Sequence, residues 1–283
     1  MKISKTDINL LIKLFKMKDF QLHDYLYNEL AKAYGKGKIV RKKGEYLVAV
    51  GSKIGLVAHL DVFGDKPPQE IVYNKNYMTA INSILGADDR TGVFIILKML
   101  QIGFRPTIIF THDEEKGTIG ATKFTKDFED IGVNYLIQLD RRGSGVVFYD
   151  NDNQEFLNYV LSFRDKEEYG SYSDISVLCP NCGVSGCNLG VGYYNEHTVG
   201  EYQDLNILSD TLDVVIKMLQ DENNSKFYEY EELDYGNYFL PKSKNGAKIY
   251  YQGSWLTEEE YYRDVFGFTE EQVDGFDEYD TIF

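Results

Sequence analysis

Cysteine, proline, basic side chains and long apolar runs are all scarce in this chain of 283 residues. Three cysteines cannot build a disulfide framework, which favours a reducing compartment. Thirty basic against 45 acidic residues give a net charge of −15, which argues against a nucleic-acid partner. The longest apolar runs, such as 92–97, are far below the ~20 residues that cross a bilayer, and the N-terminus has no signal-peptide pattern. We expect a soluble, cytoplasmic protein with no membrane partner.

The apolar pattern predicts an α/β protein. Two helices, over 8–15 and 22–30, and a hairpin over 38–50 open the chain. Strand-like runs then alternate with helical stretches, which predicts a mixed, mostly parallel sheet with helices on both faces. The strands are expected over 54–61, 107–111, 135–139, 146–149 and 185–192, and the helices over 90–102, 120–128, 154–163 and 205–219.

This pattern stops near Gln220, so we expect one domain over 1–220 and an acidic, tyrosine-rich appendage over 221–283. The appendage is predicted to contain a hairpin over 247–255 and a short helix from Glu258. Packing onto its own domain is the plainer interpretation of its tyrosines. Because tyrosine is enriched at interfaces, a homo-oligomer formed through the appendage, or a lid over the site, is the alternative.

Acidic residues and histidines recur where the predicted strands end, which is where ligands bind in parallel α/β sheets. Alone, each cluster has an ordinary explanation, such as a helix N-cap or a satisfied histidine. Together they have the composition of a hydrolytic two-metal site, with several carboxylate and imidazole ligands and a free carboxylate as base. The clusters are His59-Leu-Asp61, Asp88-Asp89, Glu114-Glu115, Asp140 and His197.

The local sequences around these residues resemble the five motifs of the cocatalytic zinc exopeptidases, the clan of the M28 and M42 aminopeptidases, the M20 deacylases and carboxypeptidases, and peptidase T. The resemblance covers about residues 50–205 and keeps the clan's motif order. It implies a three-layer αβα fold and two Zn²⁺ ions, with Mn²⁺ or Co²⁺ as substitutes. The motifs are Val57-Ala-His-Leu-Asp61, Leu85-Gly-Ala-Asp-Asp-Arg-Thr-Gly92, Thr111-His-Asp-Glu-Glu-Lys-Gly117, Leu139-Asp140 and Glu196-His-Thr198.

The resemblance also assigns roles. One zinc would be held by His59, Asp88 and Asp140, and the other by Asp88, Glu115 and His197, so that Asp88 bridges. Asp88 is preferred to Asp89 because Gly92 follows it by four residues, as a glycine does in the relatives, where the peptide between the two aspartates is often cis. Asp61 would accept a hydrogen bond from His59. Glu114 would be the general base that takes a proton from the metal-bound water and delivers it to the leaving amine.

The gaps between motifs favour one branch of the clan. Only 57 positions separate Asp140 from His197, which leaves no room for the dimerisation domain of the M20 enzymes. Only 29 positions separate His59 from Asp88, which leaves no room for the domain that M42 enzymes insert there. The chain is therefore most similar in layout to a bare M28-like catalytic domain.

Arg141 and Arg142 directly follow Asp140, and a guanidinium there could bind a substrate carboxylate in bidentate fashion. Such a contact would favour a dipeptide or an N-acyl amino acid, whereas pairing with surface acids is the plainer alternative. An aminopeptidase needs acids for the substrate's amino terminus, and Asp113, Glu114 and Glu196 are candidates.

We therefore expect a zinc-dependent aminopeptidase or dipeptidase that acts on short peptides. The alternatives are an amidohydrolase that deacylates N-acyl amino acids, a metal-bound inactive homologue that acts through protein binding, and, more weakly, a one-zinc cyclase of the glutaminyl cyclase type.

The three cysteines form half of a structural zinc pattern, Cys179-Pro-Asn-Cys182 followed by Cys187. A closed zinc site needs four ligands, so ordinary buried thiols in a loop are the preferred interpretation. Ser173-Asp174 precedes this segment, and relatives often carry an acid there near the cleft. Its role stays open.

Overall fold

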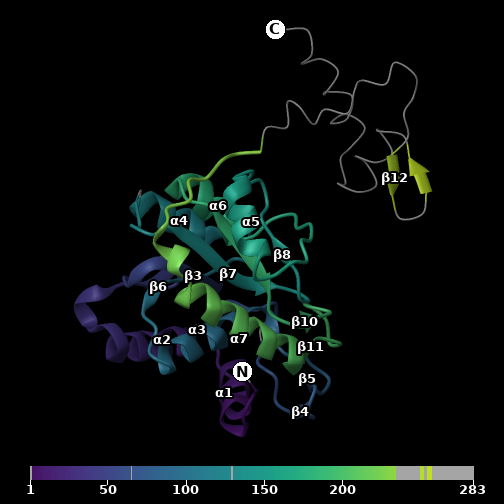
Figure 1. The fold of residues 1–283 in the computed structure, drawn as a ribbon. Coiled ribbons are helices and arrows are strands. Elements are labelled where there is room, and N and C mark those ends of the chain that lie inside the picture. The colour runs from purple at the N-terminus through teal and green to yellow at the C-terminus, as the bar shows by residue number, and fades with distance from the viewer. Residues whose placement is uncertain (1, 65, 129, 234–248, 252–253, 257–283) are drawn as a thin grey trace, which may run out of the picture. The chain divides into compact units, whose positions relative to one another are not determined.

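The structure is a computed structural model that describes residues 2–64, 66–128, 130–233, 249–251 and 254–256. The chain divides into two compact units, Met1–Leu233 and Asp234–Phe283. The first unit contains every predicted site residue and all of the secondary structure discussed below except one hairpin (Figure 1).

A seven-stranded mixed sheet forms the centre of the first unit, in the order β1-β2-β6-β3-β7-β9-β8. The four central strands, β6, β3, β7 and β9, run parallel, and the outer pairs are antiparallel. The predicted mixed, mostly parallel sheet is therefore confirmed. The strands are β1 (Ile39–Lys42), β2 (Tyr46–Ala49), β3 (Ser52–His59), β6 (Pro106–Thr111), β7 (Tyr135–Arg141), β8 (Val146–Val147) and β9 (Gly186–Gly190).

Helices cover both faces of this sheet, as Figure 1 shows, with α4 and α6 on one side and α3 and α7 on the other. The helices are α1 (Lys5–Phe15), α2 (Asp19–Tyr34), α3 (Ala87–Gln101), α4 (Ile119–Asp127), α5 (Gln154–Leu161), α6 (Asp174–Cys182) and α7 (Leu205–Gln220). None of the described helices is long and apolar enough to span a membrane.

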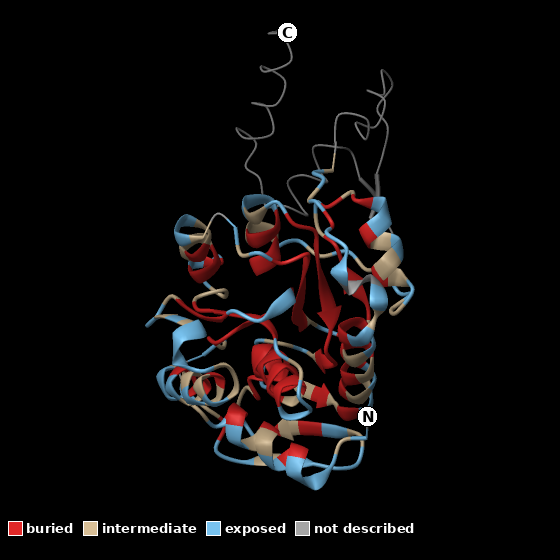
Figure 2. Ribbon diagram, turned by 60° about the vertical axis from the view of Figure 1, so that its left-hand side comes forward, coloured by how far each residue is buried: buried red, intermediate tan, exposed pale blue. Residues whose placement is uncertain are grey.

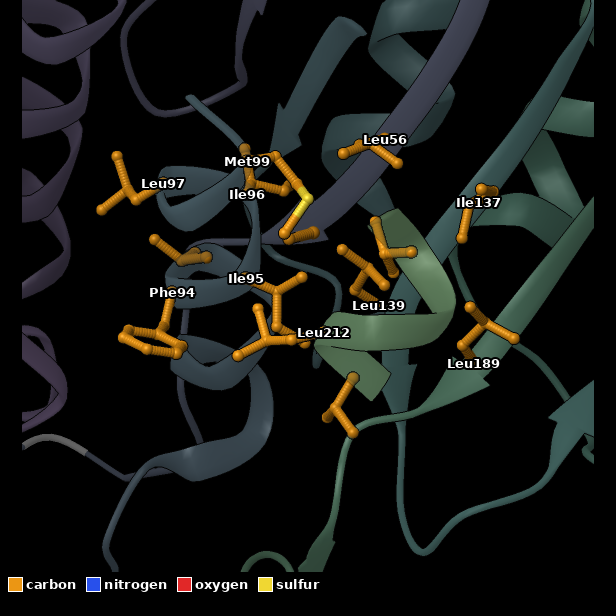
Figure 3. Close-up of a cluster of buried hydrophobic side chains, with 14 of the residues drawn as sticks. Leu56, Phe94, Ile95, Ile96, Leu97, Met99, Ile137, Leu139, Leu189 and Leu212 are labelled. Atoms are coloured by element: carbon orange, nitrogen blue, oxygen red, sulfur yellow. The ribbon is translucent and has the colours of Figure 1, made fainter. Parts of the chain in front are cut away.

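Successive strand residues point to opposite faces of the sheet, and this alternation separates the apolar core into two clusters. Leu56 and Ile137 pack with α3 and α7 in the larger cluster, whereas their neighbours Val57 and Leu136 pack with α4 and α6 in the smaller one. Figure 3 shows part of the larger cluster, and Figure 2 shows that the central strands are buried. Because both faces are covered, these strands are nearly continuous apolar runs.

Sequence patterns did not predict a second sheet, which has four strands in the order β10-β11-β5-β4. All of its pairs are antiparallel. Its strands have only two to four residues each, too few for a readable alternation. They are β4 (Ile71–Tyr73), β5 (Tyr77–Ala80), β10 (Tyr193–Tyr194) and β11 (Tyr202–Asp204).

The predicted loop around the first two cysteines is wrong, because Asp174–Cys182 is helix α6. Pro180 lies inside this helix, near its end, although a proline disfavours a helix interior. The helix begins with a capping box between Ser173 and Ser176, a signal that three residues of spacing could have revealed.

The first compact unit continues past Gln220 to Leu233. Tyr228 is buried and its ring lies against Tyr135, Phe156 and Tyr159. Further along, β12 (Ile249–Tyr251) and β13 (Ser254–Leu256) pair antiparallel, as the predicted hairpin requires. The helix expected from Glu258 lies outside the described residues.

Candidate metal centre

Five side chains predicted as metal ligands converge at the carboxyl ends of the parallel strands. His59 is the last residue of β3, and Asp140 lies near the end of β7. Glu115 follows β6, and Asp88 lies in the first turn of α3. His197 comes from the connection between β10 and β11. The parallel sheet therefore brings to one edge residues that are far apart in the sequence.

The first group contains His59, Asp88 and Asp140, all buried, with ligand atoms within 4.8 Å of one another. Nε2 of His59 lies 3.0 Å from Oδ1 of Asp88 and 3.4 Å from Oδ1 of Asp140. Nδ1 of His59 lies 3.1 Å from the carbonyl oxygen of Asp61. If Nδ1 carries the proton, Nε2 presents a lone pair to the same point as two carboxylate oxygens.

The second group contains Asp88, Glu115 and His197, again within 4.8 Å. Nε2 of His197 lies 2.7 Å from Oε1 of Glu115 and 3.3 Å from Oδ2 of Asp88. Asp88 therefore turns one carboxylate oxygen toward His59 and the other toward His197. This is the arrangement of a carboxylate that bridges two ions.

The chemistry of these donors fits divalent cations. Two imidazoles and three carboxylates are typical ligands of Zn²⁺ in hydrolases. Burial and, to a smaller extent, the charge of Asp88 raise the pKa of Asp140 to about 7 against the opposing effect of His59. Without a cation, the protein would hold these carboxylates together at a cost. The donor set therefore suits a pair of cations, as the sequence motifs predicted.

Asp61 connects His59 to the segment that carries both glutamates. Its Oδ1 accepts from the backbone N–H of Glu114 at 3.1 Å, and its Oδ2 from that of Glu115 at 3.2 Å. Oδ1 also lies 3.4 Å from Nδ1 of His59. Burial raises the pKa of Asp61, but the hydrogen bonds from His59 and the backbone outweigh it and lower the pKa to about 2. Asp61 is thus an anion that orients one imidazole and one turn at once.

Glu114 belongs to neither group of ligand atoms, although it neighbours Glu115. Its Oε1 accepts a hydrogen bond from Oγ of Ser173 at 3.2 Å, and that hydroxyl also lies 2.9 Å from Oδ2 of Asp140. Burial raises the pKa of Glu114 to about 9 despite the opposing effect of His59. Two bound cations would oppose this rise, because positive charge favours the carboxylate. A free carboxylate thus stands beside the ligands.

The two adjacent aspartates point in different directions. The peptide between Asp88 and Asp89 is cis, which the motif resemblance gave as a frequent feature. The Asp89 carboxylate accepts hydrogen bonds from the backbone N–H groups of His59 at 3.2 Å and Gly92 at 2.9 Å. Within the described residues, Asp88 rather than Asp89 belongs to both ligand groups.

No protein-family model matches the sequence, and no curated protein matches it significantly. Solved structures do match the fold. The aminopeptidase PepT from Bacillus cereus ATCC 10987 aligns with a TM-score of 0.63 and 13% identity over 76% of this chain and 97% of that chain. A tripeptidase from Staphylococcus aureus subsp. aureus Mu50 aligns with a TM-score of 0.62 and 14% identity over 78% of this chain and 100% of that chain.

A third match is the TET1 peptidase of Pyrococcus horikoshii, which can assemble into a tetrahedron or a large octahedral shell. It aligns with a TM-score of 0.56 and 13% identity over 74% of this chain and 98% of that chain. The chain has the fold of these peptidases. The fold that the motif resemblance implied is therefore confirmed.

Within this peptidase fold, three further residues hold the centre in place, and the motifs did not reveal them. Glu201 is fully buried and accepts from the backbone N–H groups of Gly86 at 2.7 Å, Ala87 at 2.9 Å and Asp88 at 3.1 Å. It thereby connects the segment after His197 to the turn that carries Asp88. Its partners lie more than a hundred positions away, so no local pattern could identify it.

Gln138 and Ser173 support Asp140. Nε2 of Gln138 donates to Oδ2 of Asp140 at 2.9 Å and to Oγ of Ser173 at 2.7 Å. A glutamine two positions before the ligand shares its face of the strand, which is the signal that could have found it. Asp174, whose role was open, faces Thr111 instead, and its fully buried carboxyl has a pKa raised to about 6 by burial.

Arg141 and Arg142 line a pocket beside His197 and also pair with acids, Glu168 and Glu196 respectively. The cysteines take no part in either candidate group, and all three are free thiols. Cys179 and Cys187 are buried, as expected for ordinary core thiols.

Proposed function

We propose that this protein is a dizinc exopeptidase that hydrolyses peptide bonds of short peptides. The observation that supports this proposal best is the bridging position of Asp88, whose two carboxylate oxygens face different histidines. A site for one ion would not need that arrangement. The free carboxylate of Glu114 beside the ligands and the peptidase fold agree with hydrolysis.

His59, Asp88 and Asp140 would hold one ion, and Asp88, Glu115 and His197 the other. When bound, two Zn²⁺ ions supply Lewis-acid polarisation of the scissile carbonyl and lower the pKa of the attacking water. Glu114 would accept a proton from that water and pass it to the leaving amine as the C–N bond breaks. One water is consumed for each peptide bond cleaved, and the products are a carboxylic acid and an amine.

The surrounding hydrogen bonds would hold the ligands and the base in position. Asp61 fixes the turn at Glu114 and Glu115 through two backbone N–H groups. The hydroxyl of Ser173 lies within hydrogen-bond distance of both Glu114 and Asp140. It would therefore hold the carboxylate of the base beside the ligand Asp140. Such positioning residues matter because shifts of about 1 Å at a metal centre or a base slow catalysis strongly.

Metal analysis and peptide hydrolysis with a Glu114→Ala variant test the proposal. We expect about two zinc per chain in the wild type and the variant, because two such groups are present, with turnover of dipeptides and amino-acid anilides lost only in the variant. Glu70→Ala removes an exposed glutamate outside the centre and serves as the matched control. Absence of bound metal, or undiminished turnover in Glu114→Ala, would contradict the proposal. An inactive, protein-binding homologue would bind zinc without any turnover.

We also propose that the unit up to Leu233 is the catalytic domain and that the protein is cytoplasmic. For the appendage, self-association is the alternative to packing onto its own domain. Light scattering of the full chain tests the last point, since a monomer would contradict it. The assembly of the Pyrococcus horikoshii peptidase shows that a chain of this fold can oligomerise.

A further inference from the structure

A pocket of about 700 Å³ opens beside the candidate centre. His197, a member of the second ligand group, forms part of its wall. The rest comes from three segments that the fold brings together, namely the end of β7 with the following turn (141–143), the segment 166–169, and the end of β10 with the connection after it (194–196). A molecule whose amide group lies at the ligands can therefore extend into this pocket.

The charge of the pocket differs from that of the whole chain. Its wall contains three cations, Arg141, Arg142 and Lys166, but only two carboxylates, Glu168 and Glu196. One positive charge is thus left over in a chain whose net charge is −15. Two bound divalent ions would add four positive charges next to the three ligand carboxylates. The local field of the pocket therefore favours an anionic ligand group.

The two arginines are held differently. The Arg141 side chain is 20% exposed; its Nη2 donates to the carbonyl oxygen of Tyr169 at 2.9 Å and its Nε faces Glu168 at 3.7 Å. Arg142 is 56% exposed and makes one ion pair, from Nη1 to Oε1 of Glu196 at 3.2 Å. Arg141 is held by the pocket wall, whereas most of the N–H groups of the Arg142 guanidinium are free to bind a ligand.

We propose that this pocket binds a free carboxylate of the substrate through Arg142, with Arg141 as a positioning residue. The proposal rests on the proposed hydrolase function and names its substrate class, which is short peptides or N-acyl amino acids with a free α-carboxylate. A planar carboxylate can accept two N–H bonds from the guanidinium of Arg142 and displace Glu196. Glu196 would then turn to solvent.

Hydrolysis of matched substrates tests the proposal. Each peptide is assayed with a free and an amidated C-terminus, and N-acetyl amino acids are compared with their amides. We expect wild type to prefer the free acid by about tenfold or more in kcat/KM, mainly through KM, since a charge-assisted hydrogen bond contributes at that level. Arg142→Gln should abolish this preference by lowering kcat/KM for the free acids about tenfold or more, mainly through KM. Which free acids are cleaved distinguishes a peptidase from a deacylase.

Lys32→Gln is the matched control, because it removes one exposed cation of an ion pair, with Glu29, from helix α2 outside the pocket. We expect its preference to equal that of wild type. The preference should also shrink with added salt, because the cation in the pocket is largely exposed. Equal kcat/KM for acid and amide in wild type, or an unchanged preference in Arg142→Gln, would overturn the proposal.

Calorimetric binding to zinc-loaded Glu114→Ala separates the pocket from the reaction. Tight binding of the free tripeptide and weak binding of its amide support the pocket even if wild type shows no turnover, in which case only the proposed function fails. Turnover in wild type with equal binding of acid and amide contradicts the pocket and leaves the proposed function standing.

Discussion

Gly92 lies where helix α3 passes close to strand β7, and replacing it by alanine tests the packing around the candidate centre. A Cβ atom at Gly92 would lie 2.3 Å from the carbonyl oxygen of Leu139 and 2.5 Å from Oδ1 of Asp89, whereas ordinary contacts begin at 3.4 Å. The helix and the strand would therefore have to separate by about 1 Å.

The size of the effect follows from two opposing contributions. Overpacking against backbone costs about 3 kcal/mol, near the upper end of the usual range. The better helix propensity of alanine offsets about 1 kcal/mol of that. We expect the free energy of unfolding of Gly92→Ala to fall by about 2 kcal/mol. Zinc affinity should fall at least tenfold, because the movement separates Asp88 on α3 from Asp140 on β7.

Urea unfolding in EDTA measures the first effect, and zinc titration of the folded protein measures the second. Gly37→Ala is the control, since a Cβ there meets nothing within 4 Å and we expect no more than a small change. If Gly92→Ala unfolds at the same or a higher urea concentration than wild type, the close approach of α3 and β7 is not what the structure implies.

Three further predictions concern pH, the domain boundary and metal. Burial raises the pKa of Asp174 from 3.8 to about 6, so the folded state holds its proton more tightly than the unfolded state. The wild type should therefore lose stability as pH rises from about 4 to 6, and Asp174→Asn should unfold with about 2 kcal/mol more free energy than wild type at pH 7 but not at pH 4. If wild type and Asp174→Asn gave the same urea unfolding curve at pH 7 as well as at pH 4, the predicted direction of the pH effect would be wrong. A chain that ends after Gln220 lacks the buried ring of Tyr228 and should lose about 3 kcal/mol or more relative to one that ends after Leu233, as calorimetry of both chains can show. Zinc at about a thousand times its dissociation constant should raise the free energy of unfolding by about 4 kcal/mol, and EDTA should reverse the gain. A melting temperature that changes with neither zinc nor EDTA would exclude metal at this centre.

Much of the architecture could be predicted from the sequence because apolar periodicity is a local property. The strands β3 and β6 contain apolar runs, over 54–58 and 108–110, which is what burial on both faces of a sheet requires. The short strands of the second sheet and helix α6 could not be predicted as readily, because two to four residues carry no period and a proline disfavours a helix.

The candidate ligands were also readable, because each stands in a short motif at the end of an element. His59, Asp88, Glu115, Asp140 and His197 were all named in advance, and the structure brings all five together. Their roles as ligands stay predictions until a metal is measured.

The sequence alone determined which side chains are the candidate ligands and the candidate base, because each stands in a short motif that can be read without the fold. Only the tertiary structure decided how they are held. Glu201 reaches the turn before Asp88 from more than a hundred positions away, and Arg142 rather than Arg141 is left exposed beside His197. These contacts depend on which strands become neighbours in the sheet. The order of the strands is fixed only when the whole chain folds, because helices must then bury the apolar residues on both faces of the sheet.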